Sequence, residues 1–198
     1  MTFESVRLAY GAKAREYVDA VGRREHIADT DLALVTDWAS KLKGKVIDVG
    51  SGPGQWTQLL TSLGAEVEGI EPVPEFLAIA KETYPNVKFR QGRAEMLDVP
   101  AQSLGGVLAW YSLIHTKPEN LHKPLTEFAR SLRPGGGLAL GFFTGPKLVA
   151  FDHAVTIAYC WPLDQLVAHI EDAGFAVAHV ESRIMSPTRT HGELLATR

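Results

Sequence analysis

The chain has 198 residues, of which 45% are hydrophobic and 22% charged, and its formal net charge is -3. This length suits one folded domain with a sizeable core, and the mixed, slightly acidic charge excludes a large basic footprint for DNA or RNA. We therefore expect a single domain over residues 1–198 that binds no nucleic acid.

Cysteine content and the N-terminal sequence predict the compartment. Cys160 is the sole cysteine, so no internal disulfide can form. Glu4, Arg7 and Lys13 interrupt the N-terminus, which lacks the apolar run of a signal peptide, and no later stretch has the length of a membrane span. We expect a cytoplasmic protein without a membrane partner.

Apolar, β-rich runs alternate with amphipathic stretches along the chain. This alternation is typical of βαβ units and predicts an α/β fold: a doubly wound, mostly parallel sheet with helices on both faces. The expected strands cover residues 45–49, 66–70, 87–91, 106–110, 137–143, 176–183 and 193–197. The expected helices cover residues 31–42, 55–63, 74–84, 120–132 and 162–173. Glycines close several of these helices, as helix stop signals predict.

The first strand runs into a loop with glycine at every second position, Gly50, Gly52 and Gly54. Glycine permits sharp turns and close approach of the backbone to a ligand. About 20 residues on, Glu71 ends the second strand, where a carboxylate accepts both hydroxyls of a ribose. Gln55 stands where a dinucleotide fingerprint needs its last glycine, and no Gly-Lys-Ser/Thr follows for a phosphate loop. The pattern therefore indicates a nucleoside site.

The pattern Asp48-x-Gly50-x-Gly52-x-Gly54 followed by Glu71 resembles the S-adenosylmethionine site of class I methyltransferases, in particular the small-molecule, type 11 and ubiquinone-biosynthesis-like enzymes. The resemblance implies a Rossmann-like seven-stranded sheet with an antiparallel last strand. It also implies S-adenosyl-L-methionine as cofactor and S-adenosyl-L-homocysteine as product, with Glu71 on the ribose diol. Asp48 either faces the methionine amine or caps loop amides as a buried strand-end carboxylate. The residues implied to bind the cofactor here are Asp48, Gly50, Ser51, Gly52, Gln55, Glu71 and Pro72.

The segment after the third strand, Gly92-Arg93-Ala94-Glu95-Met96-Leu97, resembles the family's Gly-Asp-Ala-Glu segment, which brackets adenine. Arg93 replaces the usual acid. The resemblance makes Ala94, Glu95 and Met96 cofactor contacts, although Glu95 is otherwise a solvated loop charge and Met96 ordinary packing.

The segment after the fourth strand carries Trp110, Tyr111 and His115. Trp110 is expected to shape the pocket around the cofactor's sulfonium by cation-π attraction, and Tyr111 to contact the substrate. The alternative is that both are core aromatics. His115, at a position where the family carries a histidine near the acceptor, is either a general base or a hydrogen-bonded structural residue.

The N-terminal segment, residues 1–30, contains a stretch that resembles the family's lid helix. It makes Tyr10 and Tyr17 candidate cofactor contacts and Tyr10 a candidate catalytic residue, although residues seven apart on a helix also share an ordinary packing face. Residues 145–161 are an expected acceptor-side insertion. Arg183 and Arg189 of the final hairpin favour an anionic acceptor if they reach the pocket mouth; otherwise they lie on a solvated surface.

These features together predict an enzyme that transfers a methyl group from S-adenosylmethionine to a small molecule by direct in-line attack. No metal is implied, because no His/Cys cluster has ligand spacing. The competing interpretation is a non-catalytic regulatory module that binds S-adenosylmethionine or another nucleoside. A nicotinamide oxidoreductase is disfavoured by Gln55.

Overall fold

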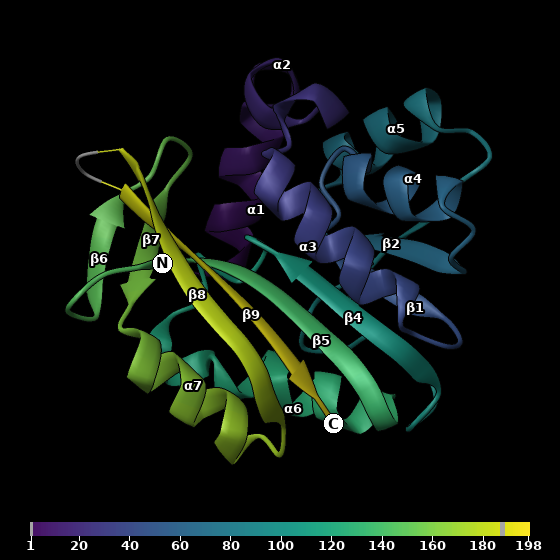
Figure 1. Cartoon of the computed structure of the whole chain (residues 1–198). Coiled ribbons are helices and arrows are strands. Elements are labelled where there is room, and N and C mark those ends of the chain that lie inside the picture. Colours follow the sequence, from purple (N-terminus) through teal and green to yellow (C-terminus); the bar gives the residue numbers. More distant parts are fainter. Residues whose placement is uncertain (1, 187–188) are drawn as a thin grey trace.

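The computed structural model describes residues 2–186 and 189–198, within which a nine-stranded sheet runs through the molecule (Figure 1). Strands β3, β2, β1, β4 and β5 lie side by side in that order, and neighbours among them are parallel. Strand β9 is antiparallel to both β5 and β8. Their bounds are β1 (Val46–Val49), β2 (Val67–Glu71), β3 (Lys88–Gln91), β4 (Leu104–Trp110), β5 (Leu132–Thr144), β8 (Ala176–Ser186) and β9 (Arg189–Thr197). The predicted α/β class, with antiparallel strands at the C-terminal end, is confirmed.

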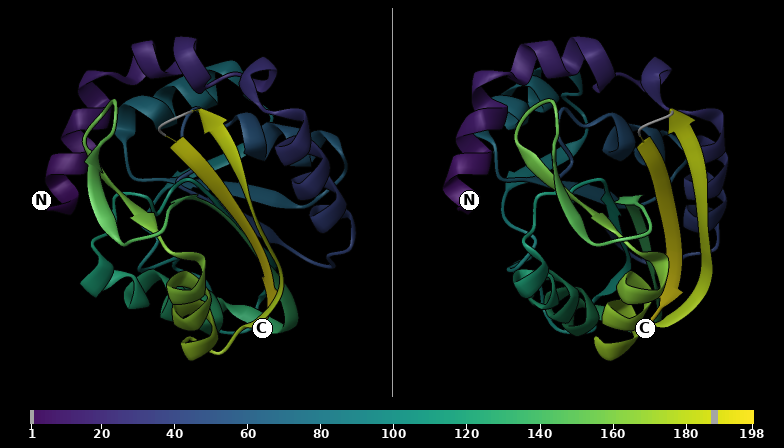
Figure 2. Two further views of the ribbon diagram at one scale, coloured as in Figure 1. Left: turned by 60° about the vertical axis from the view of Figure 1, so that its left-hand side comes forward. Right: turned by 90° about the vertical axis from the view of Figure 1, so that its left-hand side faces the viewer.

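Helices cover both faces of this sheet. Buried side chains of α3 and α4 pack on one face, and those of α6 and α7 on the other. Helices α1 and α2 cross the end of the sheet at which β1, β2 and β4 terminate (Figure 2). None of the helices described here is long and apolar enough to cross a membrane. Their bounds are α1 (Phe3–Ala12), α2 (Ala14–Val21), η1 (Arg24–His26), α3 (Asp29–Ser40), α4 (Gln55–Ser62), α5 (Pro74–Thr83), η2 (Pro118–Asn120), α6 (His122–Ser131) and α7 (Leu163–Asp172).

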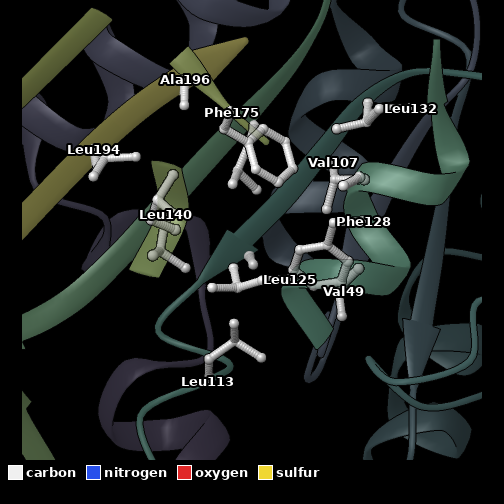
Figure 3. Close-up of a cluster of buried hydrophobic side chains, with 14 of the residues drawn as sticks. Val49, Val107, Leu113, Leu125, Phe128, Leu132, Leu140, Phe175, Leu194 and Ala196 are labelled. Carbon is white, nitrogen blue, oxygen red and sulfur yellow. The ribbon is translucent and has the colours of Figure 1, made fainter. Parts of the chain in front are cut away.

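Successive side chains along each buried strand alternate between the two faces of the sheet, so the hydrophobic core is divided into one cluster on each face. In β4, Val107 packs with the α6 and α7 cluster, whereas Leu108 and Trp110 pack with the α3 and α4 cluster, because successive side chains point to opposite faces. Phe128 of α6 is fully buried in the first cluster, together with Leu140 of β5 (Figure 3). Trp110 is therefore held on the α3 side of the sheet, at the carboxyl end of its strand.

The structure adds two strands that the sequence did not predict, β6 (Val149–Asp152) and β7 (Ile157–Trp161), within the expected insertion at residues 145–161. They form an antiparallel hairpin, and β7 pairs only with Phe143 and Thr144 at the end of β5. The pairing of β4 with β5 already stops at Gly141. The hairpin therefore continues the sheet beyond the carboxyl end of β4.

Several helices and strands begin or end at other residues than the sequence predicted. The fifth strand starts at Leu132 rather than at residue 137, because Leu132 already pairs with Leu104 ahead of a register shift. The predicted helix over residues 120–132 is observed as α6 (His122–Ser131), and the short helix η2 precedes it. The second strand extends one residue to Glu71, which pairs in register with Gln91 of β3.

Candidate active site

A cavity of about 380 Å³ opens where β1, β2 and β4 end. Open α/β sheets bind ligands at this edge, because the loops after the strands diverge there. Helices α1 and α2 supply part of its wall, and Lys13 Nζ between them donates to the carbonyl of Ala154 in the β6–β7 hairpin at 2.8 Å. The predicted site residues that line the cavity are Tyr10, Tyr17, Gly50, Gly52, Glu71, Pro72, Ala94, Glu95, Trp110, Tyr111 and His115.

Glu71 ties the glycine loop to the end of β2. Its Oε2 accepts from the Gly52 N–H at 2.8 Å and its Oε1 from the Val73 N–H at 2.7 Å. The side chain is buried, and this burial raises the pKa of Glu71 to about 7 against the opposing effect of the two N–H groups. A carboxylate has about four lone-pair sites, so two further donors can still be accepted.

Gly50 lies where a side chain has no room. Its φ is +65°, and a Cβ built on it would lie 2.5 Å from the Cβ of Ser112. Its N–H donates to the Ile70 carbonyl at 2.7 Å, which fixes the loop against β2. The loop therefore needs glycine both for its backbone conformation and for close approach to the segment after β4.

Three residues expected to contact the cofactor, Asp48, Ser51 and Gln55, do not line the cavity. Asp48 Oδ2 accepts from the Thr57 hydroxyl at 2.6 Å, beneath the loop, and burial raises the pKa of Asp48 to about 6. Asp48 is thus buried and bonded to α4, and among the described residues no hydrogen bond to the loop amides is seen. Ser51 is buried and Gln55 is the first residue of α4.

On the β3 side, Ala94 and Glu95 line the cavity, whereas Met96 is 66% exposed and does not. Arg93, which stands at the position of the expected acid, turns toward α1. Its guanidinium carbon lies 3.7 Å from the Phe3 ring centroid, and its Nε lies 3.5 Å from the Glu95 carboxylate. This cation-π contact connects the loop after β3 to the N-terminal helix.

Trp110 and Tyr111 form an aromatic wall, with their ring centroids 5.9 Å apart and nearly perpendicular. Tyr111 has φ +56°, an uncommon conformation for a bulky residue. The Tyr111 N–H donates to the Gly141 carbonyl at 3.0 Å, and its hydroxyl lies 2.8 Å from His191 Nδ1. These two contacts hold a strained residue at the cavity.

His115 joins the N-terminal helix to the β6–β7 hairpin. Its Nδ1 lies 2.7 Å from the Ile157 carbonyl oxygen, which can only accept, so we assign the ring hydrogen to Nδ1. Nε2 then accepts the Tyr10 hydroxyl at 2.7 Å. Burial lowers the pKa of His115, which keeps the ring neutral near pH 7.

Tyr10 lies on α1 and Tyr17 on α2, so they do not share one face of a single helix as their spacing suggested, although their ring centroids are 5.6 Å apart. Both rings pack on Phe76 of α5, with centroids 5.8 Å and 5.2 Å away. Burial raises the pKa of both hydroxyls. They thus contact both the cavity and the hydrophobic core, so the two interpretations of this pair are compatible.

Arg183 and Arg189, expected at the acceptor, do not line the cavity. The Arg183 guanidinium lies between the carboxylates of Asp31 and Glu193 on the α3 side of the sheet. That of Arg189 lies over the rings of Phe143 and Phe151, 5.4 Å and 5.3 Å from their centroids. The cationic residues that do line the cavity are Arg7, Arg93, Lys117 and Lys123.

One group of possible metal ligands was not indicated by sequence spacing, because its members come from two strands. Ligand atoms of His179, Glu181 and Glu193 lie within 4.8 Å of one another on β8 and β9. Arg183 Nη1 already binds Glu193 at 2.5 Å, so this carboxylate is neutralised by a side chain. We assign no metal to this group.

Comparison with known proteins shows methyltransferase relatives. Residues 46–136 match a family model described as a methyltransferase domain. A demethylmenaquinone methyltransferase from Chlorobaculum parvum is 38% identical over 93 residues, which cover 46% of this chain and 38% of that protein. An uncharacterized methyltransferase from Mycobacterium tuberculosis is 32% identical over 122 residues, 61% of this chain and 49% of that protein. The chain thus spans half or less of the length of these two relatives.

The same fold occurs in a methyltransferase of known structure. The 1,6-didemethyltoxoflavin-N1-methyltransferase from Burkholderia thailandensis, crystallised with 1,6-didemethyltoxoflavin and S-adenosylhomocysteine, superposes with a TM-score of 0.81. The match covers 98% of this chain and 88% of that one at 18% identity. At this identity the likeness establishes the fold and leaves the chemistry to the site.

Proposed function

We propose that the chain is an enzyme that transfers the methyl group of S-adenosyl-L-methionine to a small molecule, since residues 46–136 match a methyltransferase domain and the fold is that of a methyltransferase. The observation that carries this proposal is the cavity at the strand ends, where Gly50, Gly52 and Glu71 meet the aromatic wall and His115. When bound, the cofactor supplies an electrophilic methyl group activated by its sulfonium charge.

The residues present fit this cofactor. Gly50 and Gly52 bring bare backbone to the cavity, and Glu71 keeps acceptor capacity for the two hydroxyls of a ribose. The faces of Trp110 and Tyr111 attract a cation without offering a nucleophile that would itself be methylated. The chain thereby holds the donor, excludes water and leaves the acceptor to attack in line.

A small acceptor suits the size of the site. The hydrogen bond between Lys13 Nζ and the Ala154 carbonyl, 2.8 Å long, joins the helical N-terminal segment to the β6–β7 hairpin beside the cavity. A cavity of about 380 Å³ is near the lower end of the size range of small-molecule pockets, roughly 300–1,000 Å³. A cavity of this size disfavours a macromolecular acceptor. We place the acceptor on the side of His115 and Tyr111.

Tyr10 and His115 supply a route for the acceptor's proton. Because Nδ1 of His115 donates to the Ile157 carbonyl, Nε2 is the basic nitrogen, and it accepts from the Tyr10 hydroxyl. An acceptor hydroxyl or N–H beside Tyr10 can donate to the phenol oxygen while the Tyr10 proton moves to Nε2. This arrangement favours the enzyme over a non-catalytic binding module, because a binding module needs no buried base.

We further propose that the acceptor is anionic. The residues proposed to bind it differ from Arg183 and Arg189, which the sequence suggested. Arg7, Arg93, Lys117 and Lys123 line the cavity, against the carboxylates of Glu71 and Glu95. Arg7, Arg93 and Lys117 all have acidic partners, at 2.5 Å, 3.5 Å and 3.9 Å respectively, and Lys123 is exposed. Lys123 and the more loosely paired Lys117 are therefore the groups most available to a carboxylate or phosphate.

The experiment is a methyl-transfer assay that measures release of S-adenosylhomocysteine with phenols and amines, each offered as a carboxylate and as the matching carboxamide. We expect turnover with carboxylates, and a KM roughly three- to tenfold higher for Lys117→Glu and Lys123→Glu. Lys81→Glu, on α5 and outside the cavity lining, is the control. Equal or better turnover of carboxamides would contradict the anionic acceptor, and no release with any member would contradict the enzyme.

A further inference from the structure

We infer that Asp31 and Arg183 are positioning residues for the aromatic wall: they hold the Trp110 indole in place through its N–H. This inference rests on the proposed function, because the wall matters only if the cavity holds the cofactor. Neither side chain lines the cavity.

The indole is fixed from two directions. Its Nε1–H donates to Asp31 Oδ2 at 3.0 Å, and both groups are buried. Beneath it, Gly141 of β5 leaves the space the ring occupies: a Cβ there would lie 2.9 Å from Trp110 Cδ2. The Trp56 ring meets the indole edge-on, with centroids 5.8 Å apart. The orientation of Trp110 is thus set by one charged hydrogen bond and by ring packing.

Asp31 depends in turn on the C-terminal hairpin. It lies in the first turn of α3, where the helix dipole favours a carboxylate, and Arg183 of β8 pairs with its second oxygen. Arg183 also binds Glu193 of β9 at 2.5 Å. A carboxylate that is 7% exposed requires such a partner, because an unpaired buried charge is costly. The network therefore connects α3 and the hairpin to the cavity wall.

A stabilising role alone explains this network poorly. Buried ion pairs add little net stability compared with apolar side chains of similar size. A hydrogen bond to a carboxylate is, however, stronger than a neutral one, and it fixes the donor's direction. Tyr111, next in sequence, is also bonded through its polar atom, here by the neutral ring of His191, the cross-strand partner of Arg183. Both wall residues are thus fixed by their polar atoms from outside the cavity.

The test is a double-mutant cycle of Asp31→Asn and Trp110→Phe, read by calorimetric titration with S-adenosylmethionine, which carries the sulfonium charge, and by the indole ¹H–¹⁵N signals of the unliganded protein. The Trp110 signal is the one lost in Trp110→Phe. We expect Asp31→Asn to shift this signal and to weaken binding roughly tenfold, and to have no further effect on binding in Trp110→Phe. Arg183→Lys, which keeps the charge but loses the planar fork, should act in the same direction more weakly.

Asp37→Asn is the matched control, because Asp37 is an exposed carboxylate on the same helix that pairs with Lys41. It should change neither the indole signal nor the affinity. Equal loss of affinity from Asp31→Asn in both backgrounds, or an unchanged Trp110 signal, would overturn the inference. If the wild type itself does not bind S-adenosylmethionine, the proposed function fails instead, while the indole signal still reports whether Asp31 holds Trp110.

Discussion

Gly50→Ala is expected to weaken binding of S-adenosylhomocysteine by more than about a hundredfold. The new Cβ would lie 2.5 Å from the Ser112 Cβ, and φ of +65° is strained for any residue with a side chain. The loop must then move away from the segment after β4, and it carries Gly52 and its hydrogen bond to Glu71 with it. Calorimetric titration measures the affinity, and thermal unfolding shows that the variant is folded.

Two variants separate the steric clash from general strain. Gly64→Ala has φ of +87° with nothing within 4 Å of its Cβ, so it should cost about 1 kcal/mol of stability and leave the affinity unchanged. Ser112→Gly, added to Gly50→Ala, removes the other half of the clash and should restore part of the binding. Wild-type affinity in Gly50→Ala would show that the loop does not form the ligand site.

His115→Asn is expected to lower kcat for methyl transfer by about 10²- to 10³-fold while S-adenosylhomocysteine binds nearly as in the wild type. The variant keeps a polar side chain but has no basic nitrogen to take the proton from Tyr10. Tyr10→Phe should produce a similar loss, whereas Tyr17→Phe, in the same aromatic cluster, should change kcat little. The variants are compared by their rates at saturating cofactor. A wild-type kcat in His115→Asn would exclude the histidine as the base.

The pH profile gives an independent check of the same assignment. Because the pKa of His115 is lowered by burial, kcat/KM for the acceptor, measured with saturating cofactor, should rise with pH to a plateau in the wild type, with a midpoint below 6.5. Burial also lowers the pKa of His153 and His191 to about 4. Groups whose folded pKa is lowered in this way take up protons on unfolding. The stability that these histidines contribute is therefore present above pH 6.5 and lost as the pH falls below it, whereas the raised pKa values of Asp48 and Glu71 act in the opposite direction as the pH rises toward 7, so folding must be monitored alongside the rates.

The sequence predicted what is encoded locally. The strands that build the sheet and the glycine loop followed from apolar runs and from residues within about 25 positions of one another, because βαβ units are formed by neighbouring segments. The position of Glu71 at the end of β2 followed in the same way. Its contact with Gly52 spans 19 residues of chain and lies within one such unit.

Other features of the site depend on contacts that no local pattern conveys. The hydrogen bond between Tyr10 and His115 spans 105 residues. The β6–β7 hairpin pairs with only the last two residues of β5, so no long alternating run indicates it. Arg183 was expected near the cavity because it ends the predicted strand over residues 176–183. The observed β8 continues to Ser186 and turns this side chain to Asp31 on α3, a contact set by the pairing of β8 with β9 and by helix packing.

The most direct test of the central claim is calorimetric titration of the wild type and of Glu71→Ala with S-adenosylhomocysteine and, separately, with NAD. We expect binding of S-adenosylhomocysteine only, weakened roughly a hundredfold in Glu71→Ala by the loss of two charged hydrogen bonds to ribose. Because burial raises the pKa of Glu71 to about 7, binding should strengthen between pH 6 and pH 8 as the carboxylate ionises. Binding of NAD in preference, or S-adenosylhomocysteine binding unchanged in Glu71→Ala, would contradict the assignment of this cavity to S-adenosylmethionine.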